Sequence, residues 1–135
     1  MVSLTRSTAK SWRKHSFSIE KDVLVVHTSG NRGGEKVDEH AIAMWKEIEA
    51  ECQKHALHKV MIVSDVEGRL SPSDSSKVVD FLSKLDIQPH LKLSMVDLSF
   101  GSYLDNLLSE KIAYEKGVIG KVFHDEAKGR EWIGL

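Results

Sequence analysis

Short apolar runs alternate with longer amphipathic stretches along this chain. Residues 23–26 (VLVV) and 60–63 (VMIV) are unbroken and rich in β-branched side chains, which is typical of strands buried on both faces of a parallel sheet. Phe17 and Ile19 alternate with serines before a short charged turn, and this pattern predicts a hairpin into the first of those runs. The set of five expected strands is completed by residues 91–98 and 118–125.

Apolar side chains recur at helical spacing in the segments between these strands. Within residues 36–55, Ala41, Trp45, Ile48 and Cys52 follow one another at intervals of four, three and four. They therefore mark the inner stripe of a helix, and charged residues occupy its opposite side.

The next helix is expected to begin at Ser71. The motif Ser71-Pro72-Ser73-Asp74 combines a capping serine, a proline in the first turn and an acid at the third helical position, which is an acidic form of the capping box. Two further helices are expected: residues 101–116, where Leu104, Leu107, Leu108 and Ile112 recur before a stop at Gly117, and a closing helix capped by Asp125, whose Ala127, Trp132 and Ile133 turn inward.

The resulting order, β-β-α-β-α-β-α-β-α, predicts an α/β sandwich. A strand, a helix and another buried strand form a right-handed crossover, so the sheet is mostly parallel. Five strands and four helices are expected, with the first strand antiparallel at one edge. Residues 16–135 form this single domain, and residues 1–15 are a basic N-terminal arm whose lack of acidic residues overlaps the composition of organelle transit peptides.

Composition narrows the possible partners. The 135 residues carry a formal net charge of −1, so no overall field draws the protein to nucleic acid. No apolar run is long enough to span a membrane, which argues against integral membrane contact. Cys52 is the only cysteine, which rules out an intrachain disulfide and a cysteine-based zinc site. A reducing, cytoplasmic location is the simplest interpretation, with packing as the role of Cys52.

Polar residues gather where the second buried strand gives way to the second helix. An anion, a phosphoserine or a partner is electrostatically favoured at a helix N-terminus, where unpaired amides and a partial positive charge meet. The same residues also fit a simpler interpretation, in which Ser71 caps the helix and its neighbours are solvated first-turn residues. The candidate site consists of Asp65, Arg69, Ser71, Ser73, Asp74 and Ser75.

Four segments resemble the STAS family of sulfate transporter and anti-sigma factor antagonist domains: "VLVVHTSG", "HKVMIVSDVEG", the helix at Ser71 and the tail "KVFHDEAKGREWI". The likeness covers about residues 16–133 and is nearest to the SpoIIAA-like branch of free-standing bacterial proteins. It implies a non-enzymatic regulatory or partner-binding module, with Asp74, Ser75 and Ser76 matching the start of the pattern around the phosphorylated serine. Lys77 departs from that pattern, which has a glycine there, and the early helix start places Ser75 a turn inside the helix.

A second hypothesis is a carrier for a lipid or another small apolar ligand, which the same resemblance also suggests. The turn around Phe100 and Tyr103 is expected to frame its pocket. The residues assigned to this apolar pocket are Met95, Phe100, Tyr103, Leu104 and Leu107.

Other chemistry has little support in the sequence. The loop "SGNRGGE" at 29–35 lacks the spacing of either phosphate-binding glycine motif and is best explained as a flexible connection. The seven histidines form no His-x-x-x-His or His-Glu-x-x-His pair, so neither a metal nor a cofactor is expected. An enzyme ranks last because no acid, base and nucleophile converge. A homodimer is a further hypothesis, in which the edge strand at 16–20 and the N-terminal arm pair two chains, since exposed strand edges invite pairing.

Overall fold

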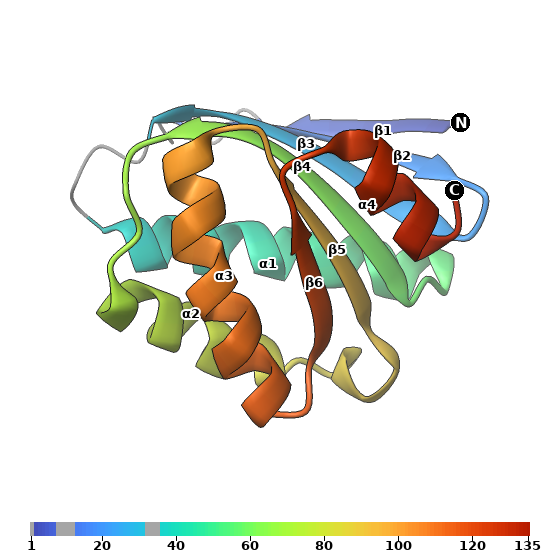
Figure 1. The fold of residues 1–135 in the computed structure, drawn as a ribbon. Helices are drawn as coiled ribbons and strands as arrows, with labels where there is room; N and C mark the ends of the chain where they lie inside the picture. Colours follow the sequence, from blue (N-terminus) through green and yellow to red (C-terminus); the bar gives the residue numbers. More distant parts are fainter. Residues whose placement is uncertain (1, 8–12, 32–35) are drawn as a thin grey trace.

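The computed structural model describes residues 2–7, 13–31 and 36–135, with side chains from Lys14 onward. Figure 1 shows a twisted sheet with helices packed against both of its faces. The elements follow the chain in the order β1 (Val2–Ser7), β2 (Arg13–Glu20), β3 (Val23–Asn31), α1 (Val37–His55), β4 (Lys59–Glu67), α2 (Pro72–Ser83), the 3₁₀ turn η1 (Gln88–His90), β5 (Lys92–Asp97), α3 (Phe100–Glu115), β6 (Ile119–Phe123) and α4 (Glu126–Ile133).

The described strands form one sheet, and their order across it is their order along the chain. β1, β2 and β3 pair antiparallel, whereas β3 to β6 pair parallel. This layout confirms the predicted α/β fold class, with a mostly parallel sheet and helices in the expected order.

The sheet has a sixth strand at its amino-terminal edge. Residues 2–7, which the sequence assigns to a basic arm, form β1 and pair with β2. Their sequence, VSLTRS, contains only two apolar residues, so no hydrophobic pattern marks the strand. The expected edge strand β2 therefore lies between β1 and β3, and β1 forms this edge of the sheet. Trp12, which belongs to none of the apolar patterns in the sequence, lies outside the described residues.

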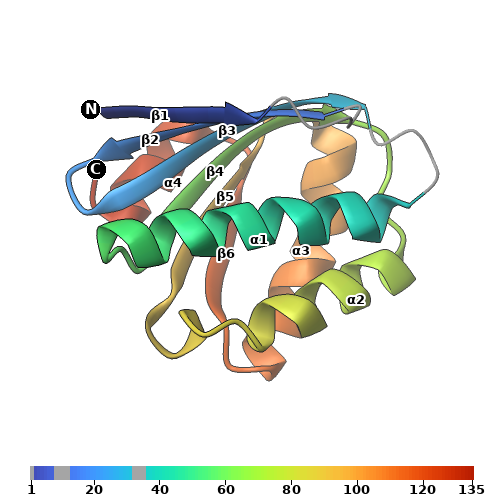
Figure 2. The same ribbon diagram turned by 180° about the vertical axis from the view of Figure 1, so that it is seen from behind.

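Of the helices in the described part of the chain, α1, α2 and α3 cover one face of the sheet and α4 covers the other. Leu24, Val26 and Ile62 pack under α1, α2 and α3 in the larger core, while Val25 and Met61, their neighbours in sequence, pack on the α4 side. Right-handed crossovers between strands in consecutive order place all the connecting helices on one face. Figure 2 shows α1 and α2 lying across that face.

The inner stripes of α1 and α4 were predicted with different success. Trp45, Ile48 and Cys52 are buried on α1, as the spacing predicts. On α4, Ile133 is fully buried, whereas Ala127 is exposed and not turned inward. Asp125 caps α4 as expected, because its Oδ1 accepts a hydrogen bond from the amide of Ala127 at 3.0 Å.

Helix α3 is oriented opposite to its hydrophobic pattern. Its buried positions are Ser102, Asn106 and Ala113, whereas Leu104 and Leu107 are 46% and 37% exposed. An amphipathic helix normally turns its apolar stripe toward the core. In α3 the small and polar side faces the sheet, and the leucine-rich side faces solvent.

Candidate functional site

The first turn of α2 uses two of its polar side chains, Ser71 and Asp74, to hold its own backbone. Ser71 Oγ accepts a hydrogen bond from the amide of Asp74 at 3.1 Å and donates to Asp74 Oδ2 at 2.9 Å. The first bond is the serine cap that the sequence predicts, whereas the Asp74 carboxylate accepts from the Ser71 hydroxyl and not from its backbone amide, as it would in a capping box. The Asp74 carboxylate also occupies the positive end of the helix, where an external anion would otherwise be favoured.

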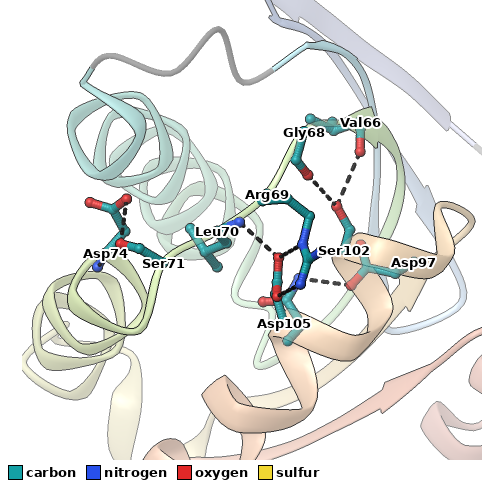
Figure 3. A network of polar contacts seen from close by, with 10 residues as sticks. Val66, Gly68, Arg69, Leu70, Ser71, Asp74, Asp97, Ser102 and Asp105 are labelled. Atoms are coloured by element: carbon teal, nitrogen blue, oxygen red, sulfur yellow. Dashed lines mark hydrogen bonds and ion pairs between the residues drawn. The ribbon is translucent and has the colours of Figure 1, made fainter.

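Arg69 is held by α3 (Figure 3). Its Nε and Nη2 donate to the two carboxylate oxygens of Asp105, each at 2.8 Å, and the amide of Leu70 also donates to Asp105 at 2.8 Å. Donating to this carboxylate raises the pKa of Arg69 above its ordinary value. Since a bidentate pair satisfies both partners, the arginine serves to fasten the β4–α2 loop to α3.

The remaining candidate residues point in different directions. Asp65 lies on the α4 side of the sheet, in register with Ser29 of β3, and lines an open hollow of about 340 Å³ together with Lys14 and His27. Ser73 is exposed to solvent. Ser75 is turned inward and only 1% exposed, and its Oγ has no hydrogen-bond partner among the described residues. The six predicted residues therefore do not assemble into one site.

A buried row of polar side chains, which was not predicted from the sequence, crosses the carboxyl ends of β3, β4 and β5 and the amino end of the antiparallel β2. His15, Thr28, Ser64 and Asp97 are successive partners in register on β2, β3, β4 and β5, and none is more than 6% exposed. His15 Nδ1 lies 3.1 Å from Thr28 Oγ1. In three of these strands the signal was a polar residue directly after an apolar run, as in "VVHT", "IVS" and "MVD".

Two polar side chains of helix α3 pack against this row and bond to the sheet. The side-chain amide of Asn106 donates to Asp97 Oδ2 at 2.7 Å, and Ser102 Oγ donates to the carbonyl of Val66 at 3.2 Å. These bonds satisfy buried polar groups that would otherwise be costly. They explain why α3 places polar residues against the sheet.

An apolar cavity of about 90 Å³ lies between α1, α2, α3 and the sheet. Met95 lines it, as do Trp45 of α1 and Ala113 of α3. Ser109 also lines the cavity, and its buried Oγ has no partner among the described residues. The cavity therefore combines an apolar wall with one hydroxyl that is able to bond a guest.

The other residues predicted for an apolar pocket are not part of this cavity. Phe100 is 60% exposed, and its ring contacts those of Tyr103 and His124 at the carboxyl end of the sheet. Leu104 and Leu107 face solvent on the outer side of α3. Only Met95 lies where a small ligand would be enclosed.

The outer side of α3 is rich in exposed apolar side chains, and we call this surface the α3 face. On a helical wheel its members fall within an arc of about 120°. Every large hydrophobic side chain that is exposed within the described part of the chain comes from residues 98–119. In Figure 1, α3 lies in front of the sheet beside β6, with no other element over it. The α3 face consists of Phe100, Leu104, Leu107, Leu108 and Tyr114.

The described residues contain no grouped side chains suited to metal binding. No cluster of three or more His, Cys, Asp or Glu side chains is placed there to hold a metal ion. Burial raises the pKa of the Cys52 thiol to about 12, so the thiolate that a nucleophile requires is disfavoured. The 29–35 loop lies partly outside the described residues.

Comparison with known proteins leaves the chain without an assigned family. No protein-family model matches it, and no curated protein matches it either. Among the described helices, none combines the length and apolar character needed to cross a membrane.

Proposed function

We propose that this protein is a non-enzymatic binding module of the STAS-like kind, and that it recognises a protein partner through the α3 face. The orientation of α3 carries this proposal. A helix with Ser102 and Asn106 inside and Leu104 and Leu107 outside leaves its apolar side without an intramolecular role. Large exposed apolar patches on soluble domains generally mark interaction sites.

The size of the α3 face fits this role. Taking about 200 Å² for each side chain, the exposed fractions of its five members amount to roughly 500 Å² of apolar surface. The largest patch of a typical monomer is about 300–600 Å². At about 25 cal/mol per Å², its burial contributes on the order of 12 kcal/mol before the costs of association are deducted.

Fewer serines at the start of α2 are accessible to phosphorylation than the sequence suggests. Ser71 is engaged in the cap and Ser75 is buried, so a phospho-responsive version of the module rests on the exposed Ser73. A phosphate there adds negative charge in the first turn of α2, where the helix dipole favours it.

Affinity capture with matched variants tests the partner-binding proposal. Leu104→Asp places a charge in the centre of the α3 face, and Gln53→Asp places the same charge on an exposed position of α1. The wild type and Gln53→Asp should retain the same proteins from an extract of the source cells, and Leu104→Asp should lose them. Identical recoveries with all three proteins would show that the α3 face is not the binding surface.

A second candidate function is a carrier for a small apolar ligand, and the cavity favours it. A volume of about 90 Å³ is smaller than the ~150 Å³ apolar cavity that holds benzene. It therefore suits a short-chain alcohol or the end of a longer amphipathic chain. The free hydroxyl of Ser109 would bond the polar group of such a guest.

Trp45 provides a direct readout for this candidate because it lines the cavity. Titration with straight-chain alcohols should change the tryptophan fluorescence of the wild type. Ala41→Leu fills the cavity from α1 and should abolish the change. Ala50→Leu makes the same substitution at an exposed position of that helix and should preserve it. A response that survives Ala41→Leu, or no response in the wild type, excludes the cavity as a ligand site.

A further inference from the structure

We infer that the partner of the α3 face is a second copy of this chain, bound through an antiparallel packing of the two α3 helices. This inference rests on the proposed partner-binding function and names the partner. Three features support it: the scarcity of charge on the face, the hydrogen-bonded amide at the edge of β6, and the area available.

The α3 face carries little charge with which to select an unlike partner. Lys111 is the charged residue at its centre, and Glu115 follows one turn later at its margin. The nearby Asp105 is neutralised by Arg69. Unlike protein partners are usually steered and selected by complementary charge, and a surface of anionic lipid requires a basic rim. An apolar surface with neither is most complementary to another apolar surface of its own kind.

An antiparallel arrangement also accommodates Lys111. In an isologous contact the same patch serves on both copies, so each residue pairing occurs twice. When Leu104 of one copy meets Leu107 of the other, the same register places each Lys111 opposite the other copy's Phe100. The ammonium group then lies over an aromatic ring, which is a favourable cation–π contact, and the two lysines stay apart.

At the edge of the sheet beside α3, a side chain bonds to a backbone amide that an incoming strand would use for pairing. Glu110 Oε1 accepts a hydrogen bond from the amide of Val122 on β6 at 2.6 Å. An incoming strand needs such outward amides as donors, so Glu110 would have to move away. Helix packing leaves this bond intact.

The area of the α3 face suits a reversible dimer. A standard interface buries about 800 Å² on each partner, and the roughly 500 Å² of exposed apolar surface would form the centre of an interface completed by its polar rim. The small net charge of −1 gives two copies little reason to repel each other.

Sedimentation velocity on the purified full chain tests the inference. The wild type should show a monomer–dimer equilibrium with a Kd in the micromolar range. Leu104→Asp and Leu107→Asp should each weaken it at least about thirtyfold, the factor that corresponds to losing a hot-spot residue. Gln53→Asp, which adds the same charge on α1, should leave it unchanged. Both leucines are more than a third exposed, so the variants should keep the wild-type circular dichroism spectrum.

Three results would overturn the inference. They are a wild type that stays monomeric to about 100 μM, a dimer that Leu104→Asp does not weaken, and a monomer that binds phosphatidylcholine–phosphatidylserine vesicles only while Leu104 is intact. A monomeric wild type that still captures another protein in a Leu104-dependent manner removes the second copy as partner and leaves the proposed function standing. Failure of both experiments removes both.

Discussion

Replacing Ser71 or Ser75 at the start of α2 with alanine should change the free energy of unfolding in opposite directions. Ser71 and Ser75 are one turn apart, but Ser71 Oγ bonds to Asp74 whereas Ser75 Oγ is buried without a described partner. Replacing each with alanine therefore removes a favourable interaction at one position and an unsatisfied hydroxyl at the other. If either serine were part of a working anion site, this simple contrast would fail.

The magnitudes follow from the two environments. Loss of a serine cap typically costs about 1 kcal/mol, within a range of about 0.5–2, so Ser71→Ala should lower the free energy of unfolding by that amount. At Ser75, removal of an unsatisfied buried hydroxyl is worth about 1–3 kcal/mol, and alanine also has the higher helix propensity. A small void left by the missing oxygen offsets part of this gain. We expect Ser75→Ala to stabilise the protein by about 1 kcal/mol.

Urea unfolding followed by circular dichroism measures both effects, and Ser73→Ala serves as the control. Ser73 is exposed in the same turn, so its replacement should change the free energy of unfolding by less than about 0.5 kcal/mol. The m-values should agree among the four proteins, since the surface exposed on unfolding is the same. A loss of more than about 1 kcal/mol in Ser75→Ala would mean that its hydroxyl has a bonding partner, and would refute the reasoning.

Two other features give predictions of their own. A side chain at Gly129 would collide with Val96 on β5. Gly129→Ala should therefore lower the free energy of unfolding by about 1–3 kcal/mol, despite the better helix propensity of alanine. The exposed control Lys128→Ala should leave the free energy of unfolding nearly unchanged, and a stabilised Gly129→Ala would contradict the close packing. Donation from Arg130 lowers the pKa of Glu20, so this pair contributes stability above the ordinary glutamate pKa of about 4.3 that is lost as pH falls through the lowered value. Glu20→Gln should therefore be less stable than the wild type at pH 7 by up to about 1 kcal/mol, and the difference should vanish in acid thermal melts; a difference that persists at pH 2 would exclude the pair as its cause.

Much of the fold was predictable because its strongest signals are local. The β-branched runs at 23–26 and 60–63 became central strands, and Ser71 and Asp125 capped helices as their spacing indicates. Strand β1 gave no such signal. Its sequence is mostly polar, and it exists because β2 presents an edge with which to pair.

The site was harder to predict because it depends on which way side chains point. Alternation along β4 sends Ser64 into the buried row and the adjacent Asp65 to the opposite face, and a shift of one residue reverses this assignment. Periodicity in α3 similarly reveals an apolar stripe but not the side on which it lies. The side of α3 that faces the sheet is set by Ser102 and Asn106, because their hydrogen-bond acceptors lie in the sheet.

The consecutive order of the strands has a consequence for biosynthesis. Each strand pairs with the one that precedes it, so every strand leaving the ribosome meets a partner that has already emerged. Each strand leaves one edge unpaired only until the next strand in the chain is translated, and the domain is able to grow in one direction. The final step is the return of α4 over β4 and β5, which seals the second face only after the rest of the sheet is complete.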